Sequence, residues 1–273
     1  MPKFAREQAI RTPNSPAMTD PSKSLTWEQV DEIINRAANL ILATDLGEKR
    51  RIAVFAENSS ETALAHLGGL FGGASSVPVN FHLTAEEAGY ILKDSESYIL
   101  FVDDKTAERG IRASREAGIT SVIGWDCQEY TEVTNWDDWL LTGSPDLCPD
   151  EVVPRPNLLY TSGTTGLPKG TELPPTMFAG GSTMTEHIEG LSQSGFAEFG
   201  THLVVGPMYH TGPLSGMRLL TLGIPSVILG RFDAETTLAT IDKYKTESAL
   251  MVPTHFVRML ALPEDVKRKY DIS

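Results

Sequence analysis

The sequence has few of the features that mark several large classes of protein. Its 273 residues include two cysteines, Cys127 and Cys148, which are too few for a disulfide framework or for a zinc site built from four thiolates. No apolar run approaches the roughly 20 residues that a membrane-spanning helix needs, and the N-terminal segment lacks the apolar core of a signal peptide. We therefore expect a cytoplasmic chain with reduced thiols and no transmembrane segment.

Basic side chains are also scarce. The chain has 23 Lys and Arg against 36 Asp and Glu, which gives a formal net charge of −13. This balance argues against nucleic acid as a partner, because such binding rests on Lys and Arg contacts to phosphates. With 41% hydrophobic residues, the composition is that of a folded globular protein.

Strand-like and helix-like segments alternate along the chain. Thr26 with Gln29, and Thr84 with Glu87, have the spacing of capping boxes that begin helices. Apolar runs predict strands at 51–56, 76–79, 98–102, 120–124, 157–161, 202–206, 226–229 and 249–252. Helices are expected near 30–41, 60–72, 84–94, 105–117, 175–189, 213–222 and 233–244, with a short one after Pro253. This alternation predicts an α/β fold with layered, mostly parallel sheets flanked by helices.

Two polar stretches suggest how the chain is divided. The first 24 residues are polar and proline-rich, and we expect an arm or an irregular edge there. Residues 141–156 hold four prolines and three acidic residues, as is typical of a linker or surface loop. The sequence therefore predicts a first α/β region over 1–150 and a second region over 151–273.

An apolar strand runs directly into a loop rich in glycine and hydroxyl groups at residues 158–170 (LLYTSGTTGLPKG). Glycines let backbone N–H groups approach an anion closely, and the hydroxyls and one lysine add further donors. The density of these groups favours a polyphosphate site over an ordinary turn. The candidate phosphate ligands are Thr161, Ser162, Gly163, Thr164, Thr165, Gly166 and Lys169.

Other phosphate-binding and nucleophile motifs fit this stretch poorly. A Walker A loop needs Gly before its Lys and Ser or Thr after it, whereas Pro168 precedes Lys169 and Gly170 follows. The spacing is not G-x-G-x-x-G, and Ser162 does not lie in a G-x-S-x-G elbow. A kinase or NTPase would also need carboxylates for Mg²⁺, for which residues 103–104 (Asp-Asp) are the candidate, although a solvated strand end explains that pair equally well.

Residues 160–170 (YTSGTTGLPKG) closely resemble the signature loop of the adenylate-forming (AMP-binding) superfamily, which includes acyl-CoA synthetases, luciferases and the adenylation domains of peptide synthetases. Two weaker motifs follow in the family's order. Residues 206–212 (GPMYHTG) resemble the segment that brings an aromatic residue and a histidine to the carboxylate pocket. Residues 252–256 (VPTHF) resemble the turn after a later strand. The resemblance extends from about Leu25 to the end of the chain.

The resemblance implies an enzyme that activates a carboxylic acid with ATP and Mg²⁺ to an acyl-adenylate and then transfers the acyl group to coenzyme A. The candidate phosphate ligands would contact ATP, and the acyl-adenylate pocket would be lined by Tyr209, His210, Thr211 and Gly212. Residues 205–216 contain no carboxylate, so a substrate amine would stay unpaired there. A fatty or other apolar acid is therefore favoured, as in a fatty-acid–CoA ligase of lipid metabolism.

The resemblance covers about the first half of such an enzyme, so residues 1–273 are expected to be a partial N-terminal AMP-binding domain. The family's motifs for adenine and ribose and its C-terminal lid do not occur before Ser273. Residues 171–176 also depart from the family pattern. We expect a truncated chain with little or no adenylating turnover alone, and assign no catalytic residue or metal ligand.

Two other functions and several residues stay open at this stage. One alternative is a non-catalytic nucleotide- or acyl-binding module, and another is an amino-acid adenylation domain. A homo-oligomer is compatible with the sequence. Tyr209 could belong to the core or to the pocket wall. Five further histidines without metal spacing are expected at the surface or packed inside, namely His66, His82, His187, His202 and His255.

Overall fold

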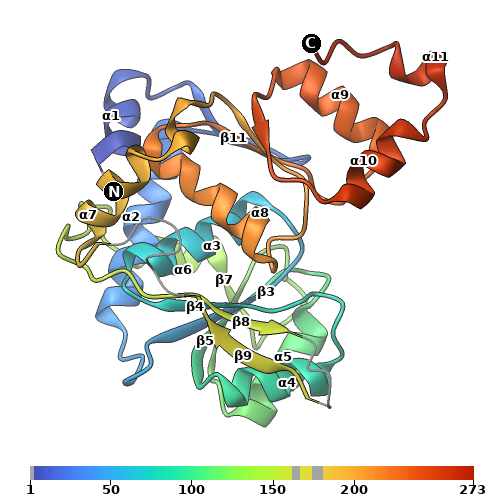
Figure 1. Cartoon of the computed structure of the whole chain (residues 1–273). Coiled ribbons are helices and arrows are strands. Elements are labelled where there is room, and N and C mark those ends of the chain that lie inside the picture. Colours follow the sequence, from blue (N-terminus) through green and yellow to red (C-terminus); the bar gives the residue numbers. More distant parts are fainter. Residues whose placement is uncertain (1–2, 162–166, 174–180) are drawn as a thin grey trace.

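Two five-stranded sheets stacked with helices make up most of the fold (Figure 1). The computed structural model describes residues 3–161, 167–173 and 181–273. The first sheet is parallel, and its strands in spatial order are β4 (Ser75–Pro78), β3 (Arg51–Phe55), β5 (Ser97–Val102), β6 (Ser121–Gly124) and β7 (Thr134–Asn135). The expected α/β fold with mostly parallel sheets is thus confirmed.

The second sheet joins the two ends of the chain. Its strands in spatial order are β12 (Ser248–Ala249), β10 (His202–Val204), β11 (Ser226–Ile228), β1 (Pro16–Thr19) and β2 (Ser24–Thr26). Only β1 and β2 are antiparallel to each other. The N-terminal segment therefore does not form a free arm, because Met18 pairs with Ser226 of β11 and is fully buried. Together with β2, strand β1 forms the edge of the sheet, and the register between β1 and β2 shifts between Pro16 and Met18, as the alternative of an irregular edge predicted.

The helices begin where local capping places them. Both expected capping boxes are present, one at Thr26 and one at Thr84. The α-helices are α1 (Lys3–Arg11), α2 (Trp27–Ala43), α3 (Ser60–Phe71), α4 (Ala85–Asp94), α5 (Ala107–Ala117), α6 (Trp136–Leu141), α7 (Met184–Ser192), α8 (Thr211–Gly216), α9 (Ala234–Tyr244), α10 (Pro253–Leu260) and α11 (Glu264–Lys267), with 3₁₀ turns η2 (Gly195–Glu198) and η3 (Met217–Leu222). No helix in the described ranges is long and apolar enough to cross a membrane.

Both faces of the first sheet are buried. Along β3, Ile52 and Val54 belong to the hydrophobic cluster that contains α2 and α3, whereas Ala53 and Phe55 belong to the cluster with α4 and α5. This alternation explains why the strand reads as a continuous apolar run. A Cβ on Gly68 would lie 2.6 Å from the Cβ of Ala37, so the glycine allows α2 and α3 to pack closely.

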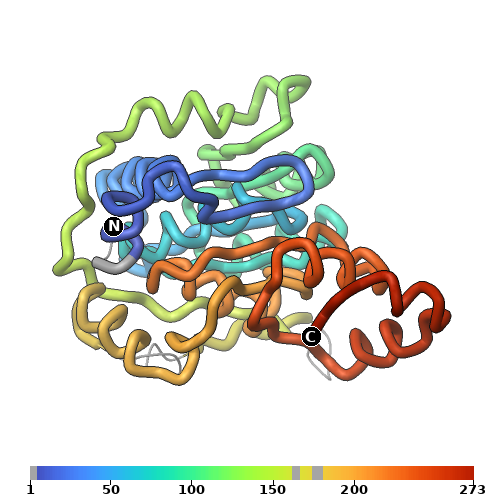
Figure 2. The backbone as a smooth tube through the Cα atoms, turned by 90° about the horizontal axis from the view of Figure 1, so that it is seen from above, coloured from blue at the N-terminus to red at the C-terminus, as the bar shows by residue number. Residues whose placement is uncertain are grey.

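The outer face of the second sheet packs against the C-terminal helices. Leu203 and Val227 form a cluster there with Ile241 and Tyr244 of α9. The segment from α9 to α11 forms a lobe at one side of the stacked layers, as Figure 2 shows in red. The carboxyl ends of β10 and β11 lie near the carboxyl end of β3, because Asn58 Nδ2 donates to Gly206 O and Leu229 O.

Candidate active site

The segment with the phosphate-loop sequence is carried by an antiparallel hairpin. Strand β8 (Leu158–Thr161) pairs with β9 (Lys169–Glu172), and Thr161 lies opposite Lys169 at the end of the hairpin where the connecting loop starts. Both residues are exposed to solvent. The sequence predicted the strand before the loop but not the polar strand after it. The other five candidate phosphate ligands, Ser162 to Gly166, lie outside the described residues.

Two side-chain contacts tie this hairpin to the end of α4 and to β3 of the first sheet. Tyr160 donates a hydrogen bond of 2.6 Å to the carboxylate of Asp94, and burial together with this bond raises the pKa of the Tyr160 phenol. Arg51, which is 7% exposed, donates to Ser95 O at 2.9 Å and to Glu172 Oε1 at 2.7 Å. The carboxylate of Glu172 is thus neutralised by Arg51, which leaves Lys169 as a positive group near the loop.

Residues 206–212 connect β10 to α8 and hold the predicted acyl-adenylate residues. His210 is the N-cap of α8, and Thr211 and Gly212 form its first turn. The Tyr209 ring meets Phe81 edge-on at a centroid distance of 5.2 Å and lies 4.4 Å from the His210 ring. Partial burial lowers the pKa of His210, so the neutral imidazole is favoured at pH 7.

One hydrophobic cluster connects the hairpin with this segment. Tyr160 of β8 and Tyr209 both pack against the cluster that contains Phe81 and Leu158. The two predicted motifs, whose residues Tyr160 and Tyr209 are 49 positions apart in sequence, therefore border the same apolar core. Tyr209 is half-buried, and its place in the pocket wall stays a prediction.

A cavity of about 180 Å³ opens beside Phe81. It is lined by residues from the loop after β4 and from the ends of β10 and β11, namely Phe81, His82, Val205, Pro207, Gly230, Arg231 and Phe232. In open α/β sheets, ligands bind outside the carboxyl ends of the strands. Apolar walls with an imidazole and a guanidinium at the rim suit the apolar part of an anionic molecule.

Sequence reasoning missed Asn58, which follows β3. Its Nδ2 donates to Gly206 O at 2.9 Å and to Leu229 O at 3.3 Å, and its Oδ1 accepts from Met208 N at 2.8 Å. The only sequence signal was its place after a buried strand and before the N-cap Ser59. That place identifies a loop but not the partners, which lie 148 or more residues away.

Of the two residues at this strand end, Asp104 is exposed, as a solvated strand end predicts, whereas Asp103 is buried. Asp103 is 5% exposed, accepts from Thr106 Oγ1 at 2.7 Å, and accepts from Glu57 N at 2.8 Å. Its carboxylate therefore organises a loop, while Asp104 pairs with Lys105 at 2.5 Å. Across the ranges that the structure describes, no three His, Cys, Asp or Glu side chains gather in a way that could hold a metal ion.

The remaining histidines and both cysteines fit structural positions. His66, His187 and His202 are buried and His82 is exposed, as expected for packed or surface residues. Cys127 and Cys148 are free and buried, and burial raises the pKa of Cys127 to about 12, which makes its thiol a poor nucleophile near neutral pH.

Comparisons with known proteins agree with these motifs. The family model described as "AMP-binding enzyme" matches residues 5–273. The chain is 28% identical over 263 residues to indoleacetate–CoA ligase from Aromatoleum aromaticum, covering 92% of this chain and 49% of that protein. It is 26% identical over 272 residues to long-chain-fatty-acid–CoA ligase FadD13 from Mycobacterium tuberculosis, covering 95% of this chain and 51% of that protein.

A solved structure from Mycobacterium tuberculosis shares the fold of this chain. The N-terminal domain of FACL13 from Mycobacterium tuberculosis superposes with a TM-score of 0.75 at 25% identity, covering 98% of this chain and 66% of that one. The chain spans about half the length of the curated relatives it matches. The signature loop, the layered α/β fold and the family match over residues 5–273 agree with one another. The chain therefore belongs to the AMP-binding enzyme family.

Proposed function

We propose that this chain supplies the phosphate-binding and acid-binding part of an ATP-dependent acyl-CoA synthetase. In that reaction a carboxylate oxygen of the acid attacks the α-phosphorus of ATP, and the bond to pyrophosphate breaks. The thiol of coenzyme A then attacks the acyl carbonyl and AMP leaves, while the thiol gives up its proton. No covalent bond to the enzyme is needed, so the chain's task is to orient the reactants and neutralise charge.

The observation that carries this proposal is the position of Lys169. Lys169 is exposed and lies opposite Thr161 at the loop end of the β8–β9 hairpin, where the sequence of glycines and hydroxyls begins and ends. A lysine at this point can neutralise phosphate charge as pyrophosphate leaves. Mg²⁺ is proposed to arrive bound to the ATP phosphates, and no protein ligand is assigned to it.

The acid is proposed to lie along residues 206–212. A neutral His210 can donate a hydrogen bond to the carboxylate without pairing it with a full positive charge, so the carboxylate keeps its nucleophilic character. The edge of Tyr209 and the apolar cavity beside Phe81 suit a fatty or other apolar acid. Thr211 and Gly212, in the first turn of α8, are proposed as part of the same pocket.

Acid-dependent exchange of pyrophosphate into ATP tests this function. The chain and the longest product of its coding sequence are assayed with decanoate, an arylacetate and a panel of amino acids. Exchange with an apolar acid that Lys169→Ala abolishes supports the proposal. Exchange only with amino acids would favour an adenylation domain, and ATP binding without exchange in either protein would favour a non-catalytic binding module.

A further inference from the structure

Asn58 uses every polar atom of its side chain to bind backbone groups. It is 8% exposed and makes the three hydrogen bonds to Gly206 O, Leu229 O and Met208 N described above. Both amide hydrogens have acceptors, and the amide oxygen has a donor. Among the side chains of this size, only a neutral amide can make this set of bonds.

The three partners lie just beyond the ends of neighbouring strands. Gly206 follows β10, Leu229 follows β11, and Met208 directly precedes Tyr209. Backbone groups beyond a strand end have no ladder partner, so buried ones must find another. Asn58 supplies that partner from the end of β3, and it thereby joins the carboxyl ends of the two sheets.

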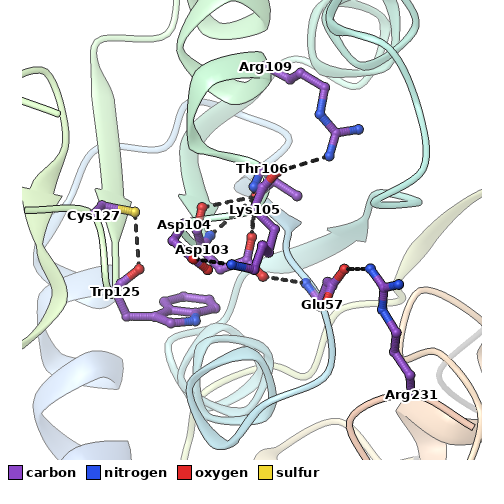
Figure 3. A network of polar contacts seen from close by, with 9 residues as sticks. All are labelled: Glu57, Asp103, Asp104, Lys105, Thr106, Arg109, Trp125, Cys127 and Arg231. Atoms are coloured by element: carbon purple, nitrogen blue, oxygen red, sulfur yellow. Dashed lines mark hydrogen bonds and ion pairs between the residues drawn. The ribbon is translucent and has the colours of Figure 1, made fainter. Parts of the chain in front are cut away.

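The loop that carries Asn58 is itself held in place (Figure 3). The N–H of Glu57 donates to Asp103 Oδ2 at 2.8 Å, and Thr106 Oγ1 donates to Phe55 O. Glu57 also forms an ion pair with Arg231, although that exposed pair adds little stability. A buried carboxylate and a buried hydroxyl thus fix the main chain on one side of Asn58, and the Ser59 N-cap fixes it on the other.

We propose that Asn58 is a positioning residue for acid activation. By fixing the main chain of residues 206–208, it sets where Tyr209 and His210 present their side chains to the acid. This inference rests on the proposed function, because it assigns those two residues to the acid pocket. Asn58 touches no reactant and acts through the segment that does.

Two substitutions at Asn58 remove different sets of its three hydrogen bonds, and a substitution at Asn35 is the matched control. Asn58→Asp keeps the oxygen that accepts from Met208 N but places a carboxylate against two carbonyl oxygens. Asn58→Ala removes all three bonds with less risk to folding. Asn35→Asp makes the same chemical change at another buried asparagine, which joins α2 to Cys148 N through a bond of 3.2 Å.

Each protein is examined by amide hydrogen exchange over residues 206–212 and by calorimetry with ATP and with decanoyl sulfamoyl-adenosine, a stable acyl-adenylate analogue. In Asn58→Ala we expect exchange at least about tenfold faster in this segment and binding of the analogue at least about tenfold weaker, because the loss of even one of the three buried hydrogen bonds predicts an effect of this size. ATP affinity should change less than about twofold, because the three side-chain bonds of Asn58 go to Gly206, Leu229 and Met208 and none goes to a described residue of the β8–β9 hairpin. Asn35→Asp should leave both the exchange and the analogue affinity unchanged.

The two proposals fail in different ways. Unchanged exchange at 206–212 in both Asn58 variants would overturn the positioning role, as would equal acceleration in Asn35→Asp. Faster exchange with unchanged analogue affinity would also overturn it, since the segment would then not position the acid. If neither the unsubstituted chain nor the longest product of its coding sequence bound the analogue, the proposed function would be contradicted, and the exchange data alone would decide whether Asn58 fixes this segment.

Discussion

Thr161 and Lys169 are register partners at the loop end of an antiparallel hairpin, so the candidate phosphate loop begins and ends at one place. We expect Lys169→Ala to weaken ATP binding about tenfold to a hundredfold, because a hydrogen bond from a charged donor contributes about 1.5–3 kcal/mol. Calorimetric titration with Mg-ATP measures this loss. Lys49→Ala is the control, since Lys49 is also exposed and lies in a distant turn. Equal affinity in the two variants would exclude Lys169 from the phosphate site.

Features that depend on neighbours in sequence could be predicted, and those that depend on distant partners could not. The capping boxes at Thr26 and Thr84 lie where expected because each joins residues three apart. Strand β1 was missed because its burial depends on pairing with β11, about 200 residues later. A four-residue strand that includes one proline carries too weak a local signal to reveal that pairing.

The same distinction applies to the candidate site. The loop sequence predicts Thr161 and Lys169 as phosphate ligands without any distant partner, because the spacing of glycines, hydroxyls and lysine is local. All four residues of strand β9 are exposed, so the strand lacks an apolar pattern that would predict it. It is held by pairing with β8 and by the Arg51–Glu172 ion pair. The proposed role of Asn58 could not be predicted from the sequence, because its hydrogen bonds reach residues 148 to 171 positions away.

His210 should affect the acid and not the nucleotide. It is the N-cap of α8 but makes no side-chain capping bond, so replacing it should cost the fold little. We expect His210→Ala to weaken binding of decanoyl sulfamoyl-adenosine about tenfold, since one hydrogen bond contributes about 1 kcal/mol, and to leave ATP binding unchanged. His210→Gln keeps a donor and should recover part of the loss. Parallel weakening of both ligands would instead indicate a general disturbance of the fold.

Acid should destabilise the fold through two buried histidines. Burial lowers the pKa of His66 to about 3 and that of His202 to about 4, whereas both titrate near 6.5 when unfolded. Between these pH values the unfolded chain binds more protons than the folded chain. The contribution of the neutral histidines to the free energy of unfolding is therefore fully present above about pH 6.5 and falls as the pH drops toward 4. For His202 the loss at pH 4 is about 3 kcal/mol.

Urea unfolding at pH 7 and at pH 4.5 measures this dependence on the histidines. Since carboxylates also titrate in this range, the comparison is between variants rather than between pH values alone. His202→Asn should reduce the difference between the two pH values, and His82→Gln, at an exposed position, should leave it unchanged. A pH dependence that is the same in all three proteins would show that His202 does not contribute.

Gly216 and His202 should be coupled through direct contact. A Cβ at Gly216 would lie 2.3 Å from His202 Nε2, and the ring is held by a 2.9 Å hydrogen bond between its Nδ1 and Ser248 Oγ. Gly216→Ala should therefore cost about 1–3 kcal/mol of unfolding free energy through overpacking, despite the higher helix propensity of alanine. Gly195→Ala, which meets nothing within 4 Å, should have little effect.

A double-mutant cycle decides whether that contact is the cause. In the background of His202→Ala, the ring is absent and the added methyl group finds space, so Gly216→Ala should cost less than it does alone. The difference is the coupling energy, which for residues in contact is about 0.5–3 kcal/mol. If the two substitutions destabilise the protein additively, the cost of alanine arises elsewhere in α8, for instance from the backbone at the start of η3.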